Sequence, residues 1–200
     1  MLVVTADQVH SRSTADRVGA ALLAINALPG LSLPAERTVG DELQVLTASP
    51  STAVELILLL ARSGDWSIGL GVGDADPVAG RSVRETNGNA FVFAREAVEL
   101  AKKRQTRFAL CTRDAVDADD AQAFIDLLLL LRARRTATAW KLHDLLRSGL
   151  SQVEAAARLG VTPQSASKTA LAAGLRVDLA SETALVRLMA RLDATSGGLT

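Results

Sequence analysis

The stretch SQVEAAARLGVTPQSASKTALAAGL, residues 151–175, has the spacing of capping and apolar residues that two short helices joined by a tight turn require. Ser151 and Glu154 form a capping box at the start of the first helix, because each side chain can bond to the backbone amide of the other residue. Gly160 can adopt the left-handed backbone that ends this helix. Thr162 is a favourable N-cap for the second helix, and a proline follows it at the first helical position. The sequence therefore predicts a helix-turn-helix.

The second helix of this unit carries side chains suited to DNA. In helix-turn-helix proteins, the N-terminal residues of the second helix contact base edges in the major groove. Amide, hydroxyl and ammonium groups can bond to bases or phosphates there. We expect these side chains to contact DNA: Thr162, Gln164, Ser165, Ser167, Lys168, Arg158 and Arg176. An αα-corner of a helical domain without any role in DNA binding is the alternative explanation of the same pattern.

The charge of the C-terminal part favours the DNA-binding interpretation. The chain has 22 basic and 22 acidic residues and is neutral as a whole. Residues 132–176, however, contain eight Lys and Arg against Asp144 and Glu154, a net charge of +6 that suits phosphate binding. A lone three-helix unit makes few base contacts, so specific binding would need two copies spaced about one helical turn, ~34 Å, apart. We therefore expect a homodimer.

The residues before the C-terminal part alternate between strand and helix patterns. Strands are expected over residues 2–7, on both sides of Gly40-Asp41, and over 66–73 and 107–112; helices are expected from Ser13 or Thr14, from Ser51 or Thr52, and over 89–104. The order β-α-β-β-α-β-α-β, with helices on one face of the sheet, is typical of the ferredoxin-like, palm-type α+β sandwich.

These patterns predict an α+β domain, residues 1–115, followed by a C-terminal tri-helical DNA-binding domain, residues 136–194. A helix over residues 116–135 would join them. A last helix after Ser181 carries a leucine-rich stripe that would face either the core or a partner helix, and residues 195–200 resemble a disordered tail.

Several classes of protein are excluded by composition. The single cysteine, Cys111, excludes an intramolecular disulfide framework. The apolar runs are far shorter than the ~20 residues of a membrane helix, and there is no signal peptide pattern, so we expect a cytoplasmic protein without a membrane partner. His10 and His143 have no Cys or carboxylate partners at ligand spacing, which argues against a zinc site.

Four segments resemble the SatD family of bacterial proteins, and a helix-turn-helix follows them. The segments are VVTADQVHSR (3–12), TVGDELQVL (38–46), SIGLGVGD (67–74) and GNAFVFAREAVELAK (88–102). The sharpest motifs are Asp7, Ser11 and Arg12 in a D-x-x-x-S-R context and the G-D-E hairpin that begins at Gly40. The resemblance extends from Met1 to about Leu175. It implies a nucleotide-cyclase-like fold with a small DNA-binding end.

The hairpin is also similar to the GGDEF hairpin of diguanylate cyclases and to the hairpin of class III adenylate cyclases. In those enzymes two carboxylates hold Mg²⁺ against a nucleotide triphosphate. The resemblance implies that Asp7 and Asp41 would hold the metal and that Asn89 and Arg95 would contact the nucleotide. The alternative is a surface ion pair between Asp7 and Arg12, with Asp41 simply a favourable hairpin residue.

We therefore expect a dimeric, sequence-specific transcriptional regulator that is not an enzyme and needs no cofactor. Its N-terminal domain would serve dimerisation or sensing. The alternative is an Mg²⁺-dependent nucleotide-binding protein or cyclase-like enzyme, with a nucleotide as ligand or effector, that the helix-turn-helix only localises. A third hypothesis is a structural adaptor whose C-terminal domain binds protein.

Overall fold

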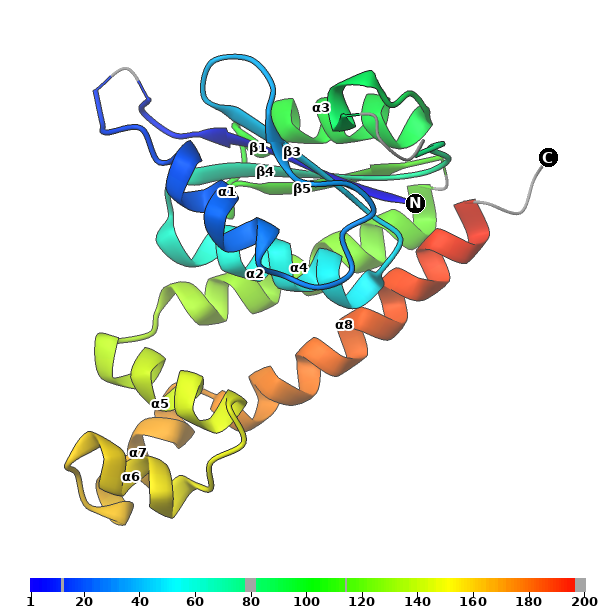
Figure 1. Ribbon diagram of the computed structural model, residues 1–200. Coiled ribbons are helices and arrows are strands. Elements are labelled where there is room, and N and C mark those ends of the chain that lie inside the picture. Colours follow the sequence, from blue (N-terminus) through cyan, green and yellow to red (C-terminus); the bar gives the residue numbers. More distant parts are fainter. Residues whose placement is uncertain (12, 78–81, 114, 197–200) are drawn as a thin grey trace. The chain divides into compact units, whose positions relative to one another are not determined.

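The computed structural model describes residues 1–11, 13–77, 82–113 and 115–196 (Figure 1). Its strands are β1 (Leu2–Gln8), β2 (Glu36–Arg37), β3 (Glu42–Thr47), β4 (Trp66–Val72) and β5 (Phe108–Thr112). Its helices are α1 (Val18–Asn26), α2 (Pro50–Ser63), the 3-10 helix η1 (Val83–Glu85), α3 (Asn89–Ala101), α4 (Ala115–Ala133), α5 (Ala137–Arg147), α6 (Gln152–Leu159), α7 (Pro163–Ala172) and α8 (Leu175–Ser196). The α+β class is confirmed, and the elements before α4 follow the predicted order with η1 added.

Contacts between residues divide the chain into two compact units. Unit 1 comprises Met1–Asp126 and Leu185–Thr200, and unit 2 comprises Leu127–Ala184. The boundaries between the units thus fall within helices α4 and α8. Within the described ranges, no helix has both the length and the apolar character that crossing a membrane requires.

The last helix begins earlier than the sequence predicts. α8 starts at Leu175 rather than after Ser181, and it continues through Thr195 and Ser196 of the expected tail. Gly174, with a φ of 61°, turns the chain directly from α7 into α8, and Leu175 is buried. The left-handed glycine therefore sets the start of α8. Residues 197–200 of the expected tail, and Arg12 of the first motif, lie outside the described residues.

Helix α1 begins later than the sequence predicts, at Val18 rather than near Ser13. The buried side chain of Gln8 explains the difference. Its Nε2 donates to the backbone oxygen of Ala15 at 2.8 Å, and its Oε1 accepts from the backbone amide of Arg17 at 2.8 Å. These bonds satisfy backbone groups that a longer helix would otherwise pair internally, so the helix starts only after them.

Strand β1 is the centre of the sheet, whose order is β2-β3-β1-β4-β5. It runs antiparallel to both neighbours, so that Val4 pairs with Val45 of β3 and with Leu70 of β4. β5 joins the edge parallel to β4. Each residue from Leu2 to Ala6 is at most 1 % exposed. A nearly continuous apolar run is what a strand covered on both faces requires.

Helices cover both faces of this sheet. α3 lies on one face, and α1 and α2 lie on the other (Figure 1). The prediction that the helices share one face is therefore wrong for α3. Every residue of β4 is buried, including the glycines that alternate with its large side chains, so both faces of β4 need a cover.

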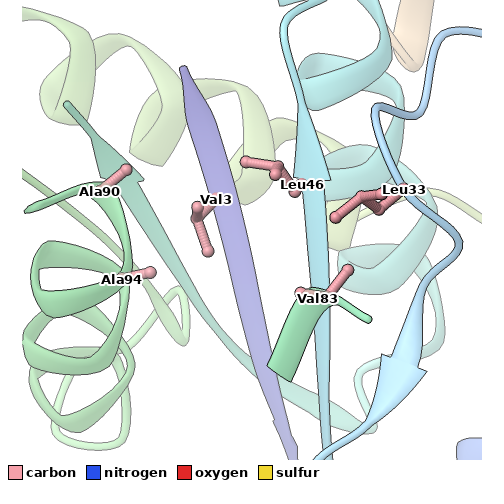
Figure 2. Close-up of a cluster of buried hydrophobic side chains, with 6 residues drawn as sticks. All are labelled: Val3, Leu33, Leu46, Val83, Ala90 and Ala94. Carbon is pink, nitrogen blue, oxygen red and sulfur yellow. The ribbon is translucent and has the colours of Figure 1, made fainter. Parts of the chain in front are cut away.

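Two glycines of β4 allow α3 to lie directly on the strand backbone. A Cβ atom added at Gly71 would lie 2.1 Å from the backbone oxygen of Ala90, and one added at Gly69 would lie 2.3 Å from the backbone nitrogen of Val98. The backbone of α3 therefore lies directly against that of β4 at these two positions. A small core adjoins this contact. Figure 2 shows it: Val3, Leu33, Leu46, Val83, Ala90 and Ala94.

Gly71→Ala should destabilise unit 1 strongly, because the new methyl group meets backbone atoms of α3 that cannot move without displacing the helix. We expect a loss of at least about 1–3 kcal/mol in the free energy of unfolding, measured by urea titration. Gly19→Ala is the matched control. Gly19 lies within α1 with nothing near its Cβ position, so alanine there should stabilise by about 0.5–1 kcal/mol. Equal stability of wild type and Gly71→Ala would contradict the close packing.

Candidate nucleic-acid interface

Helix α6 begins and ends as the sequence predicts. The backbone amide of Ser151 donates to Glu154 Oε2 at 2.7 Å, and the amide of Glu154 donates to Ser151 Oγ at 3.3 Å. Gly160 at its C-terminus has a φ of 68°. The capping box and the left-handed glycine are both confirmed, so local residues alone fix the ends of this helix.

Helix α7 starts directly after the turn. Thr162 Oγ1 accepts a hydrogen bond from the backbone amide of Ser165 at 3.1 Å, and Pro163 occupies the first turn. Val161, between the two helices, packs partly buried against the core. The predicted N-cap is confirmed, and the turn between α6 and α7 is held from both sides.

Helices α5, α6 and α7 enclose a small core. α5 starts at the N-cap Thr136, whose side chain accepts from the backbone amide of Ala139 at 3.2 Å. The buried residues of the core are Leu142, Ala155, Ala156, Ala166 and Leu175. Because most of them are alanines, the helices can lie close together, but the apolar area that they bury is modest.

The residues predicted to contact DNA are all exposed: Thr162, Gln164, Ser165, Ser167, Lys168, Arg158 and Arg176. On α7, Gln164, Ser167 and Lys168 are three and four positions apart and thus share one side of the helix. Ala166 points into the core instead. Arg158 lies in the last turn of α6, and Arg176 in the first turn of α8. The structure therefore presents these groups to solvent on consecutive elements of unit 2.

The basic surface is smaller than the count over residues 132–176 predicts. Arg132 and Arg135 are 5 % and 9 % exposed, and both contact the carboxylate of Asp178. Asp178 and Glu182 lie directly after residues 132–176. With them, the net charge of residues 132–184 is +4. Two of the eight basic residues therefore belong to the interior and are not available to phosphates.

Asp178, on α8, is fully buried and lies at the centre of this ion-pair cluster. Arg132 binds it with two parallel hydrogen bonds, from Nε to Oδ1 and from Nη2 to Oδ2, each 2.8 Å long. Arg132 Nη2 also donates to Glu182, one helical turn further along α8. Nε2 of His143, on α5, lies 3.2 Å from Asp178 Oδ2 and 3.7 Å from Glu182 Oε1. The cluster thus joins α5 to α8 and to the end of α4.

Arg135 completes the cluster from the segment between α4 and α5. Its Nη2 lies 2.7 Å from Asp178 Oδ1, although none of its guanidinium nitrogens has hydrogen-bond geometry to a described residue. The guanidinium group stacks on Trp140 instead, with 4.8 Å between its central carbon and the ring centroid. A cation–π contact of this kind offsets part of the cost of burying the charge.

The pKa values in the cluster follow from burial and from these contacts. Burial alone would raise the pKa of Asp178, but the contacts with His143 and Arg132 outweigh it and lower the pKa far below its usual range. Burial would also raise the pKa of Glu182, which His143 and Arg132 lower. For His143 the signs reverse, because burial lowers its pKa, whereas the carboxylates of Asp178 and Glu182 raise it above 6.5 overall.

His143, Asp178 and Glu182 are the one group among the described residues with three metal-ligating atoms within 4.8 Å of one another. Arg132 binds both oxygens of Asp178, so a cation would have to displace a bidentate arginine. The chemistry of the group is therefore that of an ion-pair cluster. No local sequence pattern predicts this cluster, because His143 and Asp178 are far apart in the chain; the spacing of one helical turn between Asp178 and Glu182 is the one signal that the sequence contains.

The carboxylates that the cyclase resemblance implies lie at one end of the sheet in unit 1. Asp7 pairs with Glu42 in the register of β1 and β3, and the amide of Gln8 donates to the backbone oxygen of Asp41 at 3.3 Å. The hairpin tip therefore adjoins the end of β1, as expected. Asp7 Oδ2, however, forms an ion pair of 3.1 Å with Nζ of Lys102, which follows α3.

Asn89 and Arg95 do not join this site. Asn89 is the first residue of α3, and the 13 residues of that helix, about 20 Å of length, separate it from Lys102. Asn89 donates to Asp74 at 2.8 Å, and Arg95 is exposed on the side of α3 opposite its buried alanines. The structure thus brings the backbone of the hairpin tip to the end of β1 but keeps Asn89 apart from both.

Comparison of the chain with models of protein families, with curated proteins and with solved structures gives no match.

Asp178→Asn should destabilise unit 2 by about 3–5 kcal/mol, because Arg135 would remain buried without its counter-charge and Arg132 would keep only Glu182. Unfolding in urea is best followed by the fluorescence of Trp140 in a Trp66→Phe background, since the chain has two tryptophans. Asp119→Asn, which neutralises an exposed carboxylate on α4, should leave stability within about 0.5 kcal/mol. A similarly small effect of Asp178→Asn would mean that the cluster does not stabilise unit 2.

The raised pKa of His143 makes the stability of unit 2 depend on pH. Protonated His143 stabilises the folded state below its unfolded pKa of about 6.5, and this contribution is lost as the pH rises through the higher folded value. The free energy of unfolding should therefore fall as the pH rises above about 6.5 in the wild type, and this fall should be absent in His143→Gln. His10→Gln, at an exposed position, should retain it. The same pH dependence in His143→Gln and wild type would contradict the assignment.

Proposed function

We propose that unit 2 binds the major groove of double-stranded DNA and that the protein is a sequence-specific transcriptional regulator. One observation carries this proposal: the outward side of α7 bears Gln164, Ser167 and Lys168, all exposed, at the N-terminal part of a helix that directly follows a tight turn. Gln can pair bidentately with adenine, Ser can serve several bases, and Lys can bond to guanine or to a phosphate.

The arrangement of α5, α6 and α7 favours this role over that of an αα-corner. In the helix-turn-helix, the first helix of the pair supports the second, and the N-terminal residues of the second contact base edges. Here α6 packs through Ala155 and Ala156 and leaves the outward side of α7 uncovered by described residues of unit 2. A structural adaptor whose C-terminal domain binds protein would not require exposed polar side chains along one side of α7, so that hypothesis leaves them unexplained.

Three exposed basic side chains on α7 and on the helices next to it in sequence suit contact with a phosphate backbone. Arg158, Lys168 and Arg176 flank or belong to α7, and α7 itself contains no acidic residue. Their number is small, so one copy would bind DNA weakly and its specificity would be low. This is why the proposal includes a homodimer on two half-sites, with unit 1 acting in dimerisation or in sensing an effector.

The topology of unit 1 supports a ferredoxin-like, palm-type sandwich as its fold. The strands β2-β3-β1-β4, with α1 and α2 on the same face, have the order and connections of the β-α-β-β-α-β motif. Helix α3 and strand β5 would then be additions to that motif. Membership of the SatD family and a cyclase-like ancestry remain proposals that rest on the sequence motifs.

Binding of Mg²⁺ and a nucleotide at Asp7 and Asp41 stays a prediction from the resemblance. Lys102 already neutralises Asp7, and no third carboxylate, His or Cys among the described residues completes a ligand set with the two. A cation would have to compete with the lysine. We therefore do not extend the proposal to nucleotide chemistry.

A fluorescence-anisotropy titration tests the proposal. The full chain should bind duplex from the region upstream of its own gene about 1000-fold or more tightly than unrelated duplex of equal length. Lys168→Ala should weaken binding and reduce the slope of log affinity against log salt, measured between about 50 and 200 mM, by about 0.9. The reason is that each phosphate contact releases a condensed counterion.

Lys103→Ala is the matched control, because Lys103 is an exposed lysine on unit 1. It should leave both the affinity and the salt slope unchanged. Equal affinity for both duplexes would overturn a sequence-specific regulator, and an unchanged slope for Lys168→Ala would remove Lys168 from the phosphate contacts.

A further inference from the structure

The exposed side of α7 contains a residue that the helix-turn-helix pattern does not assign. Leu171 is 85 % exposed, more than Leu23 at 80 % or Val39 at 79 %. It is the last of four exposed residues that form a stripe along α7, the other three being Gln164 and the residues three and four positions after it. The stripe consists of Gln164, Ser167, Lys168 and Leu171. Leu171 therefore continues the side that carries the proposed base contacts.

The surroundings of Leu171 favour DNA over a protein as its partner. Single exposed leucines are common, and a stable protein interface needs about 800 Å² from each side. On the outward stripe of α7, Leu171 is the one large apolar side chain, and Lys168 lies one turn before it. A protein partner would have to bury this lysine, whereas a major groove offers phosphates to the ammonium group and thymine methyl groups to the leucine.

We propose that Leu171 is a specificity-determining residue that packs against the 5-methyl groups of thymine in the major groove. This inference rests on the proposed function. Gln164 and Leu171 are seven residues apart, about 10 Å along the helix, so the two side chains would reach different base pairs of one major groove. The half-site thus contains an adenine that pairs with Gln164 and, a few base pairs away, one or more thymines that contact Leu171.

Replacing thymine by deoxyuridine tests this contact, because the exchange removes only the methyl group. A pool of duplexes with a randomised centre is first enriched on the wild-type protein. Each thymine of the enriched site is then replaced by deoxyuridine, one at a time, and the affinity is measured by fluorescence anisotropy. At one or two positions the wild type should lose about fourfold in affinity, the value expected for one buried methyl group.

Leu171→Ala should show no loss on the same exchange, because it cannot reach the methyl group. Its affinity for the thymine duplex should equal that of the wild type for the deoxyuridine duplex within about twofold. Leu23→Ala, an equally exposed leucine in unit 1, should respond to deoxyuridine as the wild type does. Circular dichroism of both variants checks that α7 is retained.

The possible failures can be told apart. If the wild type enriches no sequence, the proposed function itself fails, and the inference fails with it. If it enriches a site but no deoxyuridine exchange weakens binding, only the inference is overturned. The inference is also overturned if Leu171→Ala responds to deoxyuridine as the wild type does, or if it changes the mass of the protein in sedimentation without DNA, since Leu171 would then be a protein contact.

Discussion

Neutralisation of the buried Asp178 carboxylate is the constraint on which the geometry of unit 2 depends. The apolar core of α5, α6 and α7 is small: three of its five buried residues are alanines, and the larger side chains packed against it are only partly buried. An ion-pair cluster is directional. Arg132 approaches Asp178 with two parallel bonds, and His143 and Arg135 reach the same carboxylate from other elements. Because an unpaired charge at this depth is costly, α5 and α8 must keep the arrangement that satisfies all partners.

This use of charge in the interior limits the charge at the surface. Arg132 and Arg135 occur in the most basic part of the sequence, yet their guanidinium groups are occupied by Asp178 and Glu182. Of the exposed basic residues of unit 2, Arg158, Lys168 and Arg176 lie on α7 or on the elements next to it in sequence, whereas Arg134 follows α4 and Lys141 lies on α5. A small basic surface gives modest nonspecific affinity for DNA, so the proposed function requires that discrimination between sequences come from the side chains of the α7 stripe.

The parts of the fold that the sequence predicts correctly are those that neighbouring residues determine. The ends of α6 and the start of α7 depend on Ser151, Gly160 and Thr162, each acting within a few residues. The ion-pair cluster depends on contacts over long separations, such as Arg132 with Asp178, and no local pattern encodes which partners meet. The glycines of β4 are an intermediate case: they predict a close neighbour, but only the topology identifies it as α3.

The same close packing of α3 on β4 determines what the end of β1 can do. Because Gly69 and Gly71 fix the position of α3 on the strand, the residue that follows its last turn, Lys102, is brought to the end of the neighbouring strand β1 and to Asp7. Contact with Glu99 and Asp7 outweighs partial burial and raises the pKa of Lys102, so the ammonium group stays charged. Asp7 therefore has a counter-charge from its own chain. The ion pair with Lys102 thus gives Asp7 a structural role that requires no metal ion.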